Sequence, residues 1–108
     1  MVACEEGFAL LTEHGSVLLS NDRGHQEWRC RATSIQAMGV NVIAETPEGV
    51  FELSPDGSQR LIMCGRLLAS SRRLPYCGIT HANRVYLYGE TPLGHFAAAE
   101  RLQLPTNS

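Results

Sequence analysis

The apolar residues of the chain occur in short runs separated by turn-forming residues, a pattern that predicts β-strands. Gly, Asp, Asn, Ser and Pro interrupt the runs at intervals typical of short strands. Strands are expected at 8–12, 16–19 and 28–32, at 41–45, 50–53 and 60–63, and at 76–80 and 84–88, with further strands at 35–39 and 67–71. Tight turns between such runs predict hairpins. We therefore expect an all-β fold built from antiparallel hairpins.

An internal repeat divides this pattern into units. When the chain is compared with itself at a spacing of 34 residues, six residues recur where chance gives about one or two. The pairs are Thr12 and Thr46, Gly15 and Gly49, Leu19 and Leu53, Ser20 and Ser54, Asp22 and Asp56, and Cys30 and Cys64. A weaker third copy begins at Tyr76, with His81 to Asn83 between its strands. We predict one domain over residues 1–108, with repeat units at approximately 7–34, 35–67 and 68–104.

The recurring residues are of the kind that shapes a turn. A carboxylate at Asp22 or Asp56 accepts backbone N–H groups of its own turn. Gly24 or Gly57 then tolerates a positive φ. Trp28, which follows the first turn, is expected to pin it against the next sheet. The predicted structural turn residues are Ser20, Asp22, Gly24, Trp28, Ser54, Asp56 and Gly57.

The segment from Ser20 to Trp28, SNDRGHQEW, resembles the Asp box of β-propeller blades, found in sialidase-like and sortilin-like repeats. Ser54-Pro55-Asp56-Gly57 resembles it more loosely. The resemblance implies four-stranded sheets arranged radially, and propellers close with about four to eight such blades. About three blades cannot close a ring alone. Three possibilities follow: an open fragment, a dimer that completes a six-bladed ring, or another antiparallel fold with similar hairpins. We favour self-association, because open ends expose sheet edges and apolar faces. The resemblance transfers no catalytic residue.

The C-terminal segment supports an alternative, an α+β fold with a C-terminal helix. Thr91 and Pro92 have the pattern of a helix N-cap with proline in the first turn, and residues 96–103 are rich in helix formers. Residues 61–73 are a second helical candidate, although Gly65 and the serines disfavour it. A helix packed on a sheet would place the chain among small α+β ligand-binding or enzymatic domains.

Length and charge bound the class of protein. The 108 residues suffice for one domain with a modest core. A net charge of −2 gives no electrostatic signal for nucleic acid. No stretch reaches the roughly 18 apolar residues of a membrane span, and the first residues lack the pattern of a signal peptide. We expect a cytoplasmic protein without nucleic-acid or membrane partners, in which the four cysteines stay reduced.

Four residues are candidates for ligand binding. His14 and His81 fall in comparable inner turns, and turn histidines can gather at one rim of a propeller. Tyr86 and Tyr88 alternate along one strand, so both rings lie on the same face. Aromatic platforms of this kind bind sugars or partner chains. Burial of both strand faces between packed sheets is the competing interpretation, and we favour it.

Motifs for metal, nucleotide or nucleophilic chemistry are missing from the sequence. The cysteines and histidines form no C-x-x-C or H-x-x-x-H pair. There is no G-x-S-x-G elbow and no phosphate-binding glycine loop. We predict a non-catalytic binding or assembly module without metal or cofactor, which forms a homo-oligomer with a dimer favoured. A glycan-binding module is the alternative, so the further partner is a protein or a glycan.

Overall fold

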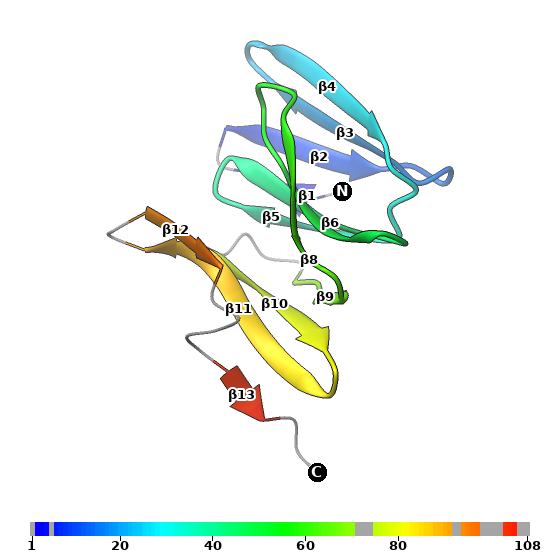
Figure 1. Ribbon diagram of the computed structural model, residues 1–108. Coiled ribbons are helices and arrows are strands. Elements are labelled where there is room, and N and C mark those ends of the chain that lie inside the picture. The colour runs from blue at the N-terminus through cyan, green and yellow to red at the C-terminus, as the bar shows by residue number, and fades with distance from the viewer. Residues whose placement is uncertain (1, 5, 71–74, 92–93, 98–102, 106–108) are drawn as a thin grey trace.

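The computed structural model describes residues 2–4, 6–70, 75–91, 94–97 and 103–105, and within them the chain forms strands and turns without any helix (Figure 1). The strands make three antiparallel sheets, in each of which four successive strands lie side by side in chain order. Sheet 1 contains β1 (Val2–Ala3), β2 (Gly7–Leu11), β3 (Ser16–Asn21) and β4 (Gly24–Arg29). Sheet 2 contains β5 (Ser34–Met38), β6 (Asn41–Thr46), β7 (Gly49–Leu53) and β8 (Gln59–Met63). Sheet 3 contains β9 (Arg66–Leu68), β10 (Tyr76–His81), β11 (Arg84–Thr91) and β12 (Gly94–Ala97), and β13 (Gln103–Pro105) also pairs with β11.

The expected all-β, antiparallel class is confirmed, and no described residue supports the α+β alternative. Within the helical candidate at residues 61–73, residues 61–63 lie in β8 and residues 66–68 in β9, while residues 71–73 lie outside the described residues. In the C-terminal candidate, residues 96, 97 and 103 lie in strands, while Pro92 and residues 98–102 lie outside the described residues. The described part of the chain also contains no helix that is long and apolar enough to cross a membrane.

The strand boundaries differ from the expected ones in the first unit. β4 begins at Gly24, four residues before the expected strand, because Asn21 pairs directly with Gly24 across a two-residue turn. Trp28 therefore lies within a strand, opposite Val17, and does not start one. The short strands β1, β12 and β13 were not expected, and β9 is the strand predicted at 67–71.

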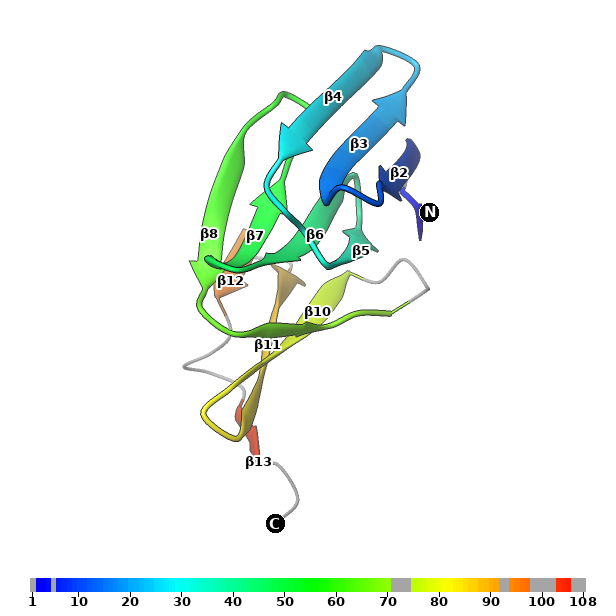
Figure 2. The ribbon, with the colours of Figure 1, turned by 90° about the vertical axis from the view of Figure 1, so that its right-hand side faces the viewer.

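Sheet 2 lies between the other two sheets, and both of its faces are buried (Figures 1 and 2). Val42 and Ala44 belong to the core shared with sheet 1, whereas Ile43 belongs to the core shared with sheet 3. Successive side chains of a strand point to opposite faces. A strand covered on both faces therefore needs the continuous apolar run that β6 has. The chain thus forms a stack of three sheets with two separate cores.

The stack gives each sheet a front face and a back face. The back face of a sheet packs on the front face of the next sheet along the chain. Sheet 1 presents Ala9, Val17, Leu19 and Trp28 from its back face to Val42, Ala44 and Leu53 on the front face of sheet 2. Sheet 2 presents Ile43 and Val50 from its back face to Cys77, Ile79 and Tyr88 on the front face of sheet 3. The same kind of contact thus occurs twice.

The hairpin registers show which residues of the three sheets are equivalent. In sheet 1 the first inner turn is closed by a hydrogen bond from the Thr12 N–H to the Ser16 carbonyl. In sheet 2 the corresponding turn is one residue shorter, because Thr46 pairs with Gly49. Val17 is therefore equivalent to Val50, at a spacing of 33, and both point from back faces.

Because the turn of sheet 2 is one residue shorter, residues after the turn are equivalent at a spacing of 33 and not 34. The spacing of 34 matches Leu19 with Leu53, but Leu19 lies on the back face of sheet 1 and Leu53 on the front face of sheet 2. The matched pair Asp22 and Asp56 is displaced in the same way. Between sheets 2 and 3 the spacing is a uniform 35, because Thr46 with Gly49 corresponds to His81 with Arg84.

Candidate functional site

Among the residues that the structure describes, the two end faces of the stack expose large apolar side chains, and the front face of sheet 1 also carries the charged pair Glu27 and Arg29 on its outer strand β4. On the front face of sheet 1, Phe8 and Leu10 are 46% and 39% exposed, whereas the equivalent Val42 and Ala44 of sheet 2 are fully buried. On the back face of sheet 3, Leu68 and Tyr76 are 51% and 46% exposed. These positions carry the side chains of an interior face but remain open to solvent. The remaining exposed large hydrophobic residue among those described, Leu61, lies on β8 of sheet 2.

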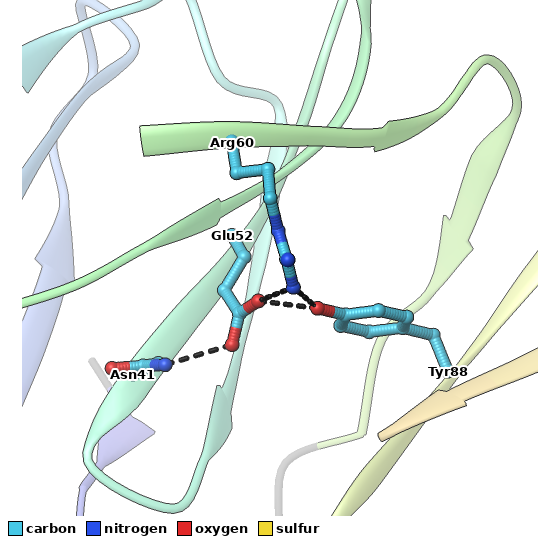
Figure 3. A network of polar contacts seen from close by, with 4 residues as sticks. All are labelled: Asn41, Glu52, Arg60 and Tyr88. Carbon is cyan, nitrogen blue, oxygen red and sulfur yellow. Dashed lines mark hydrogen bonds and ion pairs between the residues drawn. The ribbon is translucent and has the colours of Figure 1, made fainter. Parts of the chain in front are cut away.

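A polar network fastens sheet 3 to sheet 2 (Figure 3). Glu52, on the back face of sheet 2 and only 4% exposed, accepts a hydrogen bond of 2.5 Å from the Tyr88 hydroxyl at Oε1. Arg60 donates to the same oxygen at 2.9 Å, and Asn41 donates to Oε2 at 2.7 Å. Arg60 also contacts the Tyr88 hydroxyl, and its guanidinium lies 5.7 Å from the centre of the Tyr88 ring. A nearly buried carboxylate is tolerated here because a cation and two neutral donors surround it.

The network and its buried surroundings favour the protonated forms of the Cys77 thiol and the Tyr88 hydroxyl. Burial raises the pKa of the Cys77 thiol to about 12, and the charge of Glu52 contributes in the same direction. Burial is also the main cause that raises the pKa of Tyr88, followed by its hydrogen bond to Glu52. Tyr88 is thus a neutral donor that joins the sheets. None of Glu52, Arg60 and Asn41 was a sequence candidate; the signal for Glu52 was a single charge inside the apolar strand 50–53.

Two further side chains of sheet 2 bind backbone groups in and around sheet 3. The fully buried Gln36 donates to the Tyr76 carbonyl at 2.8 Å and accepts from the Ser70 N–H at 3.1 Å. Glu45 accepts from the Leu67 N–H at 2.9 Å. Because these contacts involve backbone groups, they fix how sheet 3 lies on sheet 2 whatever side chains sheet 3 carries.

The two box-like turns have different local chemistry. In the second turn the Asp56 carboxylate accepts hydrogen bonds from the Ser58 N–H at 2.8 Å and its hydroxyl at 2.6 Å, which lower the pKa of Asp56. In the first turn the acceptor is Asn21, whose Oδ1 binds the Arg23 N–H at 2.9 Å, while Asp22 is exposed at the tip. An amide and a carboxylate thus play the same role at positions that are not equivalent in the two sheets.

The other turn candidates support these bends. Gly24 and Gly57 both have positive φ, at 133° and 91°. Trp28 is 6% exposed, and its indole Nε1 donates to the Gly57 carbonyl at 3.3 Å. It therefore ties sheet 1 to the box-like turn of sheet 2. Ser20 lies on β3, and Ser54 accepts the Gly57 N–H through its backbone carbonyl.

An open cleft of about 620 Å³ lies between these two turns. Sheet 1 contributes Glu6, Arg23 and His25, and sheet 2 contributes Ser54 and Asp56. Positive and negative groups are mixed in this lining, and the cleft is open to solvent. Its charges therefore favour neither an anion nor a cation.

The ligand-binding candidates do not meet in one place. His14 and His81 are exposed on turns of sheets 1 and 3, and His14 lies 3.7 Å from the Glu13 carboxylate. His81 lines an open groove of about 450 Å³ that does not contain His14. Tyr86 and Tyr88 share the front face of sheet 3, but Tyr88 is only 4% exposed, so the two rings do not form an open platform. The residues that the structure describes contain no group of three or more His, Cys, Asp or Glu placed to hold a metal ion.

Comparisons of the chain with protein-family models, with curated proteins and with solved structures found no match. The geometry alone therefore carries the functional argument. Its most distinctive feature is the pair of uncovered apolar faces.

Proposed function

We propose that this chain is a non-catalytic assembly module of propeller-like repeats, whose uncovered faces are completed by self-association into a dimer. The observation that carries the proposal is the contrast in exposure between equivalent positions. Val42 and Ala44 are fully buried where a neighbouring sheet covers them, and Phe8 and Leu10 are exposed where none does. Burying the four large apolar side chains that each copy exposes on these faces would stabilise a dimer by roughly 25 cal/mol for each Å² removed from water.

The arrangement of the strands supports the propeller-like interpretation. The main contacts between strands of different sheets all include β5 or β9, which are the first strands of sheets 2 and 3. Contacts concentrated at the first strand of each sheet favour an arrangement of blades around an axis. Known propellers have about four to eight blades, so three units do not close a ring and two copies of three supply six.

The test is the mass of the protein in solution. By light scattering or sedimentation at high micromolar concentration, we expect twice the chain mass of 11.8 kDa. Phe8→Asp should yield monomers, because it places a charge at the centre of the uncovered front face. His14→Asp, on an exposed turn, is the matched control and should remain dimeric. A wild-type protein that stays monomeric at these concentrations contradicts the proposal.

A further inference from the structure

Both contacts between neighbouring sheets of the chain join the same two kinds of face. Sheet 1 meets sheet 2, and sheet 2 meets sheet 3, by a back face packed on a front face. The stack therefore ends with one unused front face, on sheet 1, and one unused back face, on sheet 3. A second copy of the chain offers the complement of both faces at once.

Resting on the proposed function, we infer that two copies associate head to tail, the front face of sheet 1 in each copy packing on the back face of sheet 3 in the other. One twofold axis generates both contacts, so the assembly closes and leaves no apolar face open. A symmetric contact of front face on front face would cover only half of the exposed apolar surface.

The sizes of the side chains on the two faces are complementary. The front face of sheet 1 carries larger residues than sheet 2, with Phe8 in place of Val42 and Leu10 in place of Ala44. The back face of sheet 3 carries a smaller residue at its centre, since Gly78 stands where sheet 2 has Ile43. The smaller residue on one face, with the Leu68 side chain beside it, is thus placed opposite the larger residues of the other face, which suits close packing between two sheets.

The equivalent positions also identify one specific contact. Within the chain, Glu52 of sheet 2 touches Tyr88 of sheet 3. At the spacing of 35 between sheets 2 and 3, Leu87 is equivalent to Glu52 and Tyr88 is equivalent to Leu53. At the spacing of 33 between sheets 1 and 2, Leu53 is in turn equivalent to Ser20. Leu87 of one copy should therefore lie against Ser20 of the other. At this position an uncharged leucine–serine contact replaces the contact between a carboxylate and a tyrosine.

Mixing two variants tests the direction of pairing. Leu10→Asp damages the front face and Leu68→Asp the back face, and both side chains are exposed enough in the single chain for folding to survive. Each variant alone should be monomeric, because both contacts of its dimer contain the charge. An equimolar mixture should give a one-to-one heterodimer in native mass spectrometry, since one of its two contacts joins two undamaged faces.

The other outcomes separate failure of this inference from failure of the proposed function. If Leu68→Asp remains dimeric while Leu10→Asp does not, pairing is front to front and the inference is overturned although the module still self-associates. Wild-type assemblies larger than a dimer would contradict the inference that two copies close on each other. A monomeric wild-type protein removes both the inference and the proposed function.

A cross-link provides an independent measurement that does not depend on the charged variants. One chain carries Ser20→Cys and the other Leu87→Cys, both in a Cys64→Ser background that removes the exposed native thiol. Oxidation of the mixture should produce a disulfide-linked heterodimer, and oxidation of either chain alone should not. A dimeric protein that yields no such heterodimer excludes head-to-tail pairing.

Discussion

At the scale of single residues, the contact between sheets 2 and 3 depends on groups that stay protonated. Cys77 is 1% exposed and packs beside Ile79 and Tyr88 in the core of that contact. Its pKa rises from 9.0 to about 12, because burial disfavours the thiolate and Glu52 repels it. In the unfolded chain this thiol is solvated and ionises near its ordinary pKa.

Stability should therefore fall in alkaline solution. Below pH 9 the thiol is protonated in both states, so its contribution is fully present; between pH 9 and 12 only the unfolded state releases the proton. The free energy of unfolding should drop by about 1.4 kcal/mol per pH unit in that window. Denaturant titrations from pH 7 to 11 measure this slope, which Cys77→Ala should reduce and the exposed-thiol control Cys64→Ala should not. An equal slope in Cys77→Ala would show that the thiol is not the source.

The sequence predicted little of this contact, for a physical reason. The alternation of Tyr86 and Tyr88 placed both rings on one face, and the register agrees. The partner of Tyr88, however, is Glu52, 36 residues earlier, and only the packing of sheet 3 on sheet 2 brings the two together. A carboxylate inside an apolar strand indicates a buried polar contact without naming its donors.

At the scale of elements, the β3–β4 and β7–β8 turns differ in length and in the residue that accepts the backbone hydrogen bond. The β3–β4 turn has two residues, Asp22 and Arg23, and its side-chain acceptor is Asn21. The β7–β8 turn is longer, running from Leu53 to Gln59, and its acceptor is Asp56. Both bends use a short side chain that binds a backbone N–H two residues on, an arrangement that favours turns over strands.

Three alanine substitutions distinguish the acceptors. Asn21→Ala should lower the free energy of unfolding by about 1 kcal/mol, because the Arg23 N–H loses its partner. Asp56→Ala should also destabilise, since it removes two hydrogen bonds to Ser58. Asp22→Ala should leave stability nearly unchanged. Thermal unfolding of the three variants beside the wild type provides the comparison, and a loss in Asp22→Ala equal to that in Asp56→Ala would contradict this assignment.

The elements themselves were largely predictable, and their alignment was not. Alternation of apolar and polar positions locates strands well, because the period of two is a local property. Identical residues at a fixed spacing are less informative. A single residue less in the turn between Thr46 and Gly49 moves every later side chain to the opposite face, so Leu19 and Leu53 match in sequence but not in structure.

At the scale of the whole molecule, the pattern of each sheet agrees with its place in the stack. The continuous apolar run of β6 belongs to a sheet covered on both sides, whereas Phe8 and Leu10 alternate with the buried Ala9 in a sheet covered on one side. The sequence carries this distinction as a difference of pattern. It does not carry the order in which faces meet, because that depends on contacts between strands far apart in the chain.

The proposed self-association at these faces should make stability depend on protein concentration. Because the folded chain binds its partner and the unfolded chain does not, the Tm of the wild type should rise over about a hundredfold increase in concentration. Two copies joined in tandem by a flexible Gly/Ser linker should instead have a constant Tm, higher than that of the wild type in dilute solution, because the linker holds the second copy at an effective concentration of about millimolar. Tandem chains carrying Leu10→Asp in both copies are the control and should lose this gain. A wild-type Tm that does not change with concentration would mean that the two faces remain uncovered in solution.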